Sequence, residues 1–359
     1  MNQVNPFSMV STVRAKATPA IHEFDLIRTL HRRYGRRTPS VIQGIGDDAA
    51  VIGAKAGQWT VLTTDLLTEG VHFDLRTATM SDIGFRAAAA NLSDIAAMGG
   101  TPQYLLVALA IPRTGTSRAV HHLYRGMMAA CRPHQVELIG GDTSASNSGW
   151  FLSMTLMGAV PRRKALFRHG ARIGDFLYTT GTLGDSLAGL SILNEPPNRT
   201  KRHPRAATFS TRHRKFLIER HLRPTARIAE GQWLSAHHFA TSAIDISDGL
   251  SGDLRHLCEE SHVGADIDLS TLPLSPACRA YAFSRRLDPV NLALTGGEDY
   301  ELLFTVSPRQ RSRLERTIIE QEFSVTCIGK IHTPRFGIQA VSPHGQRRRL
   351  INTSYEHFT

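Results

Sequence analysis

The sequence has 359 residues, of which 41% are apolar and 20% are charged, so it can form a hydrophobic core and is long enough for two domains. Its longest apolar stretch, Tyr104–Ile111, is far shorter than the roughly 18 residues of a membrane span. No apolar segment of signal-peptide type lies near the N-terminus. The four cysteines are widely spaced without a CxxC pair, which argues against a disulfide framework or a zinc knuckle. We therefore expect a soluble cytoplasmic protein that does not bind membranes.

The net charge of +11 is unevenly distributed along the chain. The excess of basic residues lies in residues 1–20, 194–215 and 335–349, and the remainder is close to neutral. These basic segments lack the interleaved aromatic residues and the recognition-helix pattern of nucleic-acid-binding proteins. The charge therefore disfavours a nucleic acid as the main partner.

Residues 1–20 are polar, contain no acidic residue and predict a flexible extension. Alternating strand and helix patterns then predict an N-terminal domain over residues 21–160. Its expected elements are a helix over Ile21–Tyr34, strands over Ala49–Ile52 and Trp59–Thr64, a helix capped by Ser81 and running to Met98, a strand over Tyr104–Ile111, a helix over Ser117–Cys131, and strands over Val136–Ile139 and Phe151–Val160.

The pattern starts again near Pro161 and predicts a C-terminal domain over residues 161–359. Residues 194–213 interrupt it and predict a basic loop insert, because they cannot bury enough apolar surface to be ordered. The two halves predict an α/β fold of two lobes. The expected elements of the second lobe are a strand over Asp175–Thr179, helices over Asp185–Leu193 and Thr225–His237, a strand over Ser242–Ile246, a helix capped by Ser247 and running to Glu260, a strand over Leu302–Val306 and a helix over Pro308–Ile319.

Acidic residues recur beside glycines or hydroxyl residues next to predicted strands. Each set taken alone is typical of a surface turn. Together they indicate a ligand site, because open α/β sheets present their ligands at the carboxyl ends of strands. The five sets are Gly44-Ile45-Gly46-Asp47-Asp48, Thr63-Thr64-Asp65, Gly140-Gly141-Asp142, Asp245-Ile246-Ser247-Asp248-Gly249 and Gly296-Gly297-Glu298-Asp299.

Gathered carboxylates need a countercharge, because two unit charges about 4 Å apart repel by about 4 kcal/mol near a protein surface. Divalent cations provide one, and the hydroxyls of Thr63 and Thr64 are suitable oxygen ligands for them. Asp94 is the most informative acid, because it lies in Phe85–Met98, the Ala-rich part of the predicted helix that Ser81 caps. An ionised acid on a closely packed helix is costly unless it is paired or metal-bound. A solvated helix face is the alternative for Asp94.

Several common active-site motifs are absent from the sequence. It contains neither GxxxxGK[ST] nor a GxGxxG between strand and helix. It also lacks HExxH, a Cys/His cluster and GxSxG. If the substrate is a phosphate, metal ions must hold it.

Seven segments occur in an order and spacing that resemble one enzyme family. They are GIGDDAAVI, TTDLLTEGVHF, NLSDIAAMGG, LIGGDTS, TGTLGDSLAGL, AIDISDGL and TGGEDYELLFTV. The chain resembles the thiamine-monophosphate kinases over roughly residues 21–358. They share a superfamily with aminoimidazole ribonucleotide synthetase and selenophosphate synthetase. The resemblance implies a two-domain PurM-like α/β (α+β) architecture, in which the N-terminal sheet forms a barrel across a homodimer.

The resemblance also implies roles for individual residues. Asp65 and Asp94 would bridge metal ions and Arg168 would offset charge on the transferred group, which makes these three the expected catalytic residues. Expected ligands of several Mg²⁺ ions are Asp48, Thr63, Thr64, Asp65, Asp94, Asp142, Asp245 and Asp248. Expected ATP contacts are Asp48, Gly141, Arg168 and Ser247. Residues expected to line the thiamine phosphate pocket are His72, Glu298 and Tyr355.

Some of these assignments have simpler alternatives. His72 fits an exposed strand end, and Tyr355 fits a residue that packs near the C-terminus. Arg168 is one of many arginines, and spacing alone does not decide whether Glu298 or Asp299 faces a ligand. Asp47 adjoins the expected metal site without an assigned role.

The function implied is an ATP-dependent kinase that converts thiamine monophosphate to thiamine diphosphate, the last step of thiamine diphosphate biosynthesis. The expected mechanism is direct in-line transfer on a Mg²⁺ cluster, since phosphoryl transfer requires mainly positioning and charge neutralisation. Three alternatives are another ATP-dependent enzyme of the superfamily, a nucleic-acid-binding protein that uses the basic insert, and a nucleotide sensor without turnover. A selenide-using enzyme is disfavoured, because no cysteine precedes Cys131.

Overall fold

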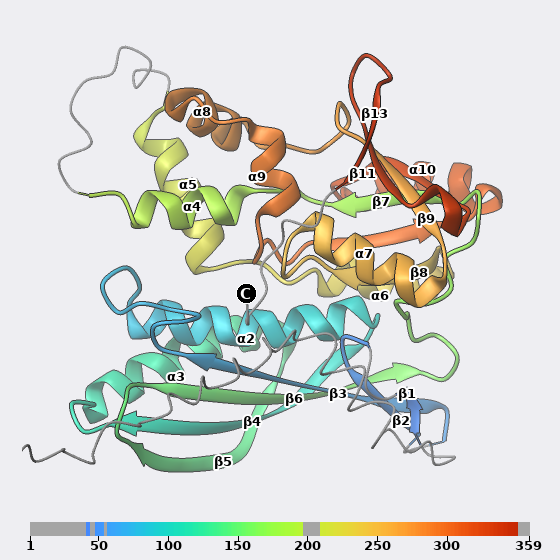
Figure 1. Ribbon diagram of the computed structural model, residues 1–359. Coiled ribbons are helices and arrows are strands. Elements are labelled where there is room, and N and C mark those ends of the chain that lie inside the picture. Colours follow the sequence, from blue (N-terminus) through green and yellow to red (C-terminus); the bar gives the residue numbers. More distant parts are fainter. Residues whose placement is uncertain (1–40, 44–46, 54–55, 197–208, 351–359) are drawn as a thin grey trace, which may run out of the picture.

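The computed structural model describes residues 41–43, 47–53, 56–196 and 209–350. It has two lobes, each built on one β-sheet, with helix α2 (Met80–Ala97) between them (Figure 1). The predicted extension and the predicted helix over Ile21–Tyr34 lie outside the described residues. Within the described ranges, no helix combines the length and apolar character needed to cross a bilayer.

The first lobe contains a six-stranded sheet with strand order β1-β2-β3-β6-β4-β5. All neighbours in it are antiparallel except β4 and β5. Alternate residues of β6 are buried, as expected for a sheet with one covered face. The strands are β1 (Val41–Gln43), β2 (Ala50–Gly53), β3 (Gln58–Thr68), β4 (Thr101–Pro112), β5 (Glu137–Ser146) and β6 (Phe151–Pro161).

Helices α2 and α3 (Ser117–Cys131) cover one face of this sheet (Figure 1). α2 forms because its alanines favour helix and because Thr79 and Asp82 make a capping box at its N-terminus. The two helices approach closely at Gly84, where a Cβ atom would lie 2.0 Å from the carbonyl oxygen of Leu123. The 3₁₀-helix η1 (Arg132–His134) follows α3.

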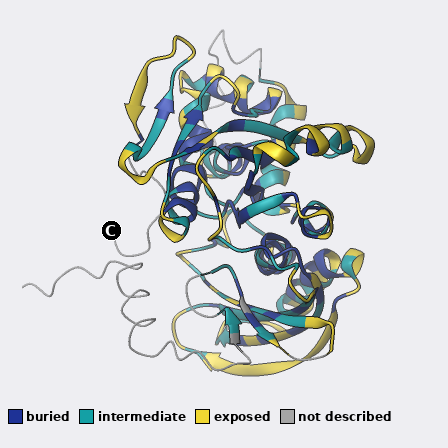
Figure 2. Cartoon of the chain, turned by 90° about the vertical axis from the view of Figure 1, so that its right-hand side faces the viewer, coloured by how far each residue is buried: buried dark blue, intermediate teal, exposed yellow. Residues whose placement is uncertain are grey.

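The opposite face of the first sheet is uncovered and partly apolar. Leu66 of β3 and Tyr104 and Leu106 of β4 are 56%, 38% and 43% exposed. The edge strand β5 is exposed over nearly its whole length, and Figure 2 shows this edge of the molecule in yellow. The first lobe therefore presents a free edge and an uncovered sheet face.

The second lobe contains a seven-stranded sheet with strand order β13-β12-β9-β11-β7-β10-β8. Its neighbours are antiparallel except β9 and β12. The strands are β7 (Phe176–Thr180), β8 (Ala240–Asp245), β9 (Gly264–Asp268), β10 (Leu302–Val306), β11 (Val325–His332), β12 (Ile338–Val341) and β13 (Arg347–Arg349). The helices are α4 (Asp185–Leu193), α5 (Thr211–Leu222), α6 (Ile228–His237), α7 (Leu250–Ser261), α8 (Pro276–Arg285), α9 (Pro289–Thr295), α10 (Pro308–Gln321) and the 3₁₀-helix η4 (Pro334–Phe336).

The two lobes meet through α2. One apolar cluster contains Ile95 of α2 together with Trp233 of α6 and Ala243 of β8. Gly231 of α6 lies so near α2 that a Cβ atom on it would be 2.1 Å from the carbonyl oxygen of Ala96. Because this core spans both lobes, the division at 160/161 stays a prediction.

Two predicted strand ends are wrong. β3 continues past Asp65 to Thr68, because it pairs with β6 along its full length. β5 likewise continues through Gly141 and Asp142 to Ser146 beside β4. Glycine and polar residues favour turns locally, but pairing with a long neighbouring strand overrides that preference.

Two predicted helix caps are also wrong. The side chain of Thr79, not that of Ser81, accepts the capping hydrogen bond of α2. α7 begins after Gly249 rather than at Ser247. In each case the helix start differs by two residues, because several residues that favour caps stand close together.

The predicted loop insert is too long at its C-terminal end. Residues 211–213 belong to α5, which starts where the Ser210 hydroxyl accepts a hydrogen bond from the backbone N–H of His213. At the other end, Glu195 pairs with Arg214 of α5 and Arg285 of α8. Residues 197–208 of the insert lie outside the described residues.

Candidate active site

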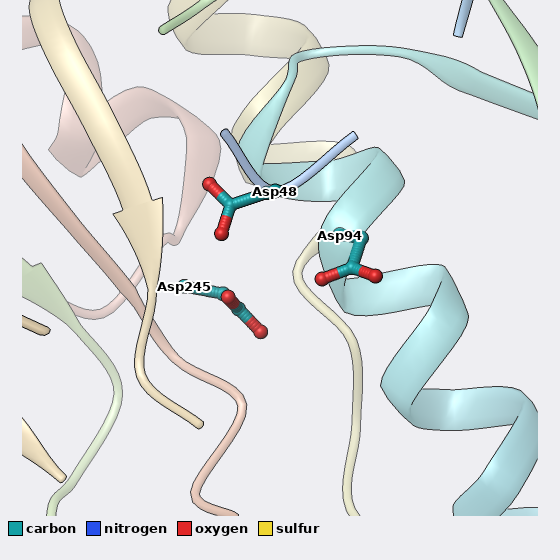
Figure 3. Close-up of side chains that lie close together, drawn as sticks. All are labelled: Asp48, Asp94 and Asp245. Atoms are coloured by element: carbon teal, nitrogen blue, oxygen red, sulfur yellow. The ribbon is translucent and has the colours of Figure 1, made fainter. Parts of the chain in front are cut away.

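Three carboxylates from distant parts of the sequence converge between the lobes. One side-chain oxygen each from Asp48, Asp94 and Asp245 lies within 4.8 Å of the others (Figure 3). Asp48 stands just before β2, Asp94 lies on α2, and Asp245 ends β8 of the second lobe. The site therefore requires both lobes.

Asp94 lies in an environment that disfavours an isolated charge. Burial raises the pKa of Asp94 well above its usual value, and the nearby carboxylates of Asp65, Asp245 and Asp48 raise it further. Its Oδ2 accepts a hydrogen bond from the hydroxyl of Thr63. A bound cation would reverse this preference and hold the carboxylate in its ionised form.

Asp245 joins the second lobe to α2. It is 2% exposed, and its Oδ2 accepts a hydrogen bond of 2.6 Å from the hydroxyl of Ser93. Burial, followed by the charge of Asp48, raises the pKa of Asp245 well above its usual value. Ser93 precedes Asp94 on α2. This hydrogen bond therefore fixes the position of the Asp245 carboxylate relative to that of Asp94.

Asp48 has one oxygen bound and one unpartnered. Its Oδ1 accepts a hydrogen bond from Nη2 of Arg168, whereas its buried Oδ2 has no hydrogen-bond partner among the described residues. Burial opposes the charge on Arg168, but Asp48 and Asp47 outweigh that effect and raise the guanidinium pKa. Burial and the charge of Asp48 raise the pKa of Asp47 to about 7. The orphaned oxygen is the kind of atom that a metal ion would satisfy.

The predicted set Thr63, Thr64 and Asp65 is divided between the two faces of β3. Side chains alternate along a strand, so Thr63 and Asp65 face α2 and the carboxylates, while Thr64 faces the other way. The Thr64 hydroxyl donates to the carbonyl of Met154 at 3.0 Å. Burial raises the pKa of Asp65 to about 6. The side chains of Thr63 and Asp65 thus adjoin the site, and that of Thr64 does not.

The loop after Asp245 is held by an acid that sequence reasoning missed. Asp253 of α7 accepts backbone hydrogen bonds from Asp248 at 3.2 Å and Gly249 at 3.0 Å. The carbonyl of Ser247 accepts one from the backbone N–H of Glu298 at 2.7 Å. The sequence signal that could have identified Asp253 is its place in the first turn of a predicted helix, a position that favours anionic hydrogen-bond acceptors.

Asp142 and Gly141 lie away from the three carboxylates of their own chain. Both are on β5, and β6 and β4 separate β5 from β3 in the sheet. At about 4.8 Å per strand pairing, β5 lies about 14 Å from β3. Asp142 is also exposed. A single chain therefore does not bring Asp142 into the carboxylate cluster.

Two of the predicted pocket residues, His72 and Glu298, are linked by Arg86 of α2. Nη2 of Arg86 donates to the carbonyl of His72, and its Nε lies 3.6 Å from Oε1 of Glu298. Burial raises the pKa of Glu298, and Arg86 opposes that rise. Tyr355, the third predicted pocket residue, lies outside the described residues.

The structure distinguishes Glu298 from Asp299. Asp299 is fully buried and accepts a hydrogen bond from the backbone N–H of Ser186 at 3.0 Å, at the start of α4. Burial raises its pKa to about 7. The side chain of Glu298 is 30% exposed. Glu298 is therefore the acid of this pair that a ligand can reach.

Comparisons with known proteins show which family this chain belongs to. Residues 46–160 match the family model "AIR synthase related protein, N-terminal domain". The chain is 38% identical over 344 residues to the thiamine-monophosphate kinase of Escherichia coli (strain K12), which covers 94% of this chain and 99% of that one. The Buchnera aphidicola (subsp. Schizaphis graminum) thiamine-monophosphate kinase is 34% identical over 342 residues, with coverages of 94% and 99%. This chain belongs to the thiamine-monophosphate kinase family.

A solved member of this kinase family supports the fold. The structure of AaThiL complexed with AMPPCP and TMP matches with a TM-score of 0.79 at 33% identity, and the match covers 94% of this chain and 97% of that one. The resemblance to thiamine-monophosphate kinases that the seven sequence segments predicted is thus confirmed, as is a mixed α/β PurM-like fold.

Proposed function

We propose that the protein transfers the γ-phosphoryl group of ATP to the phosphate of thiamine monophosphate, giving thiamine diphosphate and ADP as the last step of thiamine diphosphate biosynthesis. One observation carries the proposal in a chain of this family. Asp48, Asp94 and Asp245 converge from two lobes, and the buried Oδ2 of Asp48 has no hydrogen-bond partner within the described part of the chain. AaThiL, a solved homologue, was crystallised with AMPPCP and TMP, which supports ATP and thiamine monophosphate as the two substrates.

The donor set fits Mg²⁺. Every candidate ligand is an oxygen, as hard divalent cations prefer, and the buried carboxylates need a countercharge. When bound, Mg²⁺ would neutralise charge between two anionic reactants. The residues proposed to hold several such ions are Asp48, Thr63, Asp65, Asp94, Asp245 and Asp248.

The protein's own groups would position the reactants. Arg168 holds Asp48, and its buried Nε has no hydrogen-bond partner among the described residues. We propose that this guanidinium also faces the transferred phosphoryl group, where it would offset developing charge. Ser247, in the loop that Asp253 orders, would contact the nucleotide. The acceptor phosphate is already an oxyanion, so no side-chain nucleophile or phosphoenzyme is needed.

A homodimer is part of the proposal. The uncovered face of the first sheet exposes Leu66, Tyr104 and Leu106, and apolar residues gathered on one face favour association with a second copy. Leu106→Glu should convert the dimer to a monomer in light scattering. Ile319→Glu, at an 80% exposed site on α10, is the control that should leave the dimer intact. A wild-type monomer would reject this part of the proposal.

The activity is tested directly with purified protein. Incubation with Mg-ATP and thiamine monophosphate should yield thiamine diphosphate and ADP in equal amounts, and omission of Mg²⁺ should abolish both. ATP binding without thiamine diphosphate would reject the proposal in favour of a nucleotide sensor or another enzyme of the superfamily.

A further inference from the structure

A second buried cluster lies beside α2, the helix that also carries Asp94. Its centre is Arg86, which is 3% exposed. The three nitrogens of its guanidinium are directed at three different segments. Nη1 lies 2.8 Å from Nε2 of His221 on α5, Nη2 donates to the carbonyl of His72, and Nε lies 3.6 Å from Oε1 of Glu298. Arg86 therefore joins the segment after β3 to two segments of the second lobe.

The contact between Arg86 and Glu298 is incomplete. At 3.6 Å it is an ion pair rather than a hydrogen bond, and the buried Nε of Arg86 has no hydrogen-bond partner among the described residues. A closer approach of Glu298, or a ligand group, would satisfy this N–H. Such a geometry is expected of a site that tightens when a ligand binds.

His221 supports this arrangement as a neutral ring. Burial, together with the charge of Arg86, lowers the pKa of His221 to about 3. Because Nε2 faces a donor of Arg86, Nδ1 carries the proton and donates to the hydroxyl of Ser186 at 3.0 Å. Nδ1 also lies 3.4 Å from Oε2 of Glu298. Arg86 is thus the cation that faces Glu298. His221 fixes the orientation of the Arg86 guanidinium through the contact at Nη1.

Glu298 is oriented from one side and open on the other. Its backbone has a φ of 61°, a left-handed conformation that is uncommon outside glycine and that accumulates at functional sites. Its carboxylate lies against Arg86 and His221 on one side, yet its side chain is 30% exposed. A carboxylate accepts hydrogen bonds from N–H groups and attracts cations, and it repels phosphate. Its open side therefore suits the organic, nitrogen-bearing part of the acceptor.

We infer that Arg86 is a positioning residue for the acceptor substrate, which fixes His72 and Glu298 relative to each other across the two lobes. This inference rests on the proposed kinase function and deepens it. Arg86 itself need not touch the substrate. Its role is to hold the carboxylate of Glu298 where it receives the amino group or cationic ring of thiamine monophosphate, away from the phosphate-binding carboxylates.

The test separates acceptor binding from nucleotide binding. Arg86→Gln and Arg86→Lys should each raise the KM for thiamine monophosphate at least tenfold and change the KM for ATP less than twofold. Lysine should not restore the acceptor KM, because its compact ammonium cannot span the three separated partners that the nitrogens of a planar guanidinium reach. The matched control is Arg223→Gln, which removes an exposed pair between the residue that follows α5 and Asp82 of α2. The control should leave both KM values unchanged.

A double-mutant cycle shows whether Arg86 acts through Glu298. Glu298→Gln should raise the acceptor KM, and addition of Arg86→Gln should raise it less than twofold further, because coupled residues are not additive. Equal rises in both KM values, or full additivity, would mean a general structural role and would overturn the inference. If the Arg86 variants do not fold, His221→Asn provides the second test, since it must also raise the acceptor KM selectively. A wild-type protein without kinase activity rejects the proposed function and this inference together, whereas an active wild type with unaltered Arg86 variants rejects this inference alone.

Discussion

At the scale of single residues, the burial of Asp94 conflicts with its charge. Because its native pKa lies above the usual 3.8, the native state holds the proton more tightly than the unfolded state. The free energy of unfolding without metal therefore falls as the pH rises above about 4 and the carboxylate is forced to ionise. Perturbed pKa values of this kind cluster at functional sites.

Asp94→Asn should separate activity from stability. We expect kcat to fall at least a hundredfold, because a proposed metal bridge is lost. The Tm in a metal chelator at pH 8 should equal or exceed that of the wild type, because the buried charge at position 94 is removed. Added Mg²⁺ should raise the Tm of the wild type only. Asp266→Asn, in β9 of the second lobe, is the control for kcat, and retained activity in Asp94→Asn would contradict the assigned role.

His221 makes a prediction about acid stability. Its native pKa of about 3 lies below the usual 6.5, so between these pH values the ring is protonated in the unfolded state and neutral in the native state. Stability is therefore complete above about pH 6.5 and decreases as the pH falls toward about 3. At pH 5 the loss is about 2 kcal/mol. Glutamine can accept from Arg86 and donate to Ser186, so His221→Gln should remove this loss.

Urea denaturation at pH 7 and pH 5 measures the effect. Between these pH values the wild type should lose about 2 kcal/mol more unfolding free energy than His221→Gln, since other titrating groups contribute equally to both proteins. Parallel losses in the two proteins would show that His221 is accessible to protons in the native state.

At the scale of elements, α2 is the helix on which the site depends. It carries Ser93 and Asp94 toward β8, and it carries Arg86 toward α5. Its distance from α6 is set by Gly231, whose missing side chain lets the backbone of Ala96 come close. The spacing of two helices therefore controls the distance between carboxylates of different lobes.

Gly231→Ala should disturb this spacing. Its Cβ would lie 2.1 Å from the carbonyl oxygen of Ala96, so one helix must move, at a cost of about 1–3 kcal/mol. As a control, Gly329→Ala creates a similar conflict, at 1.9 Å, with the carbonyl oxygen of Asp266 between β11 and β9, away from the site. Both variants should lose unfolding free energy, but only Gly231→Ala should lower kcat at saturating substrates and a temperature where both are folded. Equal kcat values would show that α2 does not set the site's geometry.

Hydrophobic periodicity predicted the positions of elements better than their ends. It placed α3 at Ser117–Cys131 and β10 at Leu302–Val306 to the residue. It stopped β3 and β5 at their polar residues, because pairing between distant strands is not visible in local sequence. Short elements such as β9 and β13 carry too few residues to show a period.

The candidate site was predictable as a set of residues but not as an arrangement. The carboxylates stand out beside glycines, and the resemblance assigned them to metal ions. Arg86 was missed, although it is the only basic residue between Met80 and Met98. The contacts on which its inferred role rests come from α5 and the Glu298 loop, more than a hundred residues away in sequence. Long-range contacts of this kind have no local signature.

At the scale of the whole molecule, Asp142 is, like Thr64, a predicted ligand whose side chain its own chain does not bring to the site. It lies exposed on the edge strand β5, beside the uncovered sheet face proposed to bind a second copy. If a second copy binds at this face and Asp142 has the ligand role that the family resemblance implies, the simplest arrangement is that each chain supplies Asp142 to the carboxylate cluster of its partner. Each active site would then combine Asp94 of one chain with Asp142 of the other.

Mixing two inactive variants tests this arrangement. Asp142→Asn and Asp94→Asn should each be inactive as pure dimers. After co-expression or refolding together, about half of the dimers are mixed, and each mixed dimer has one site that lacks both acids and one that is intact. Activity should therefore return to about a quarter of the wild-type value, because the symmetry of a two-fold dimer places the two lesions in the same site. If the two acids act within one chain, every site retains a lesion, and the mixture should stay as inactive as its components.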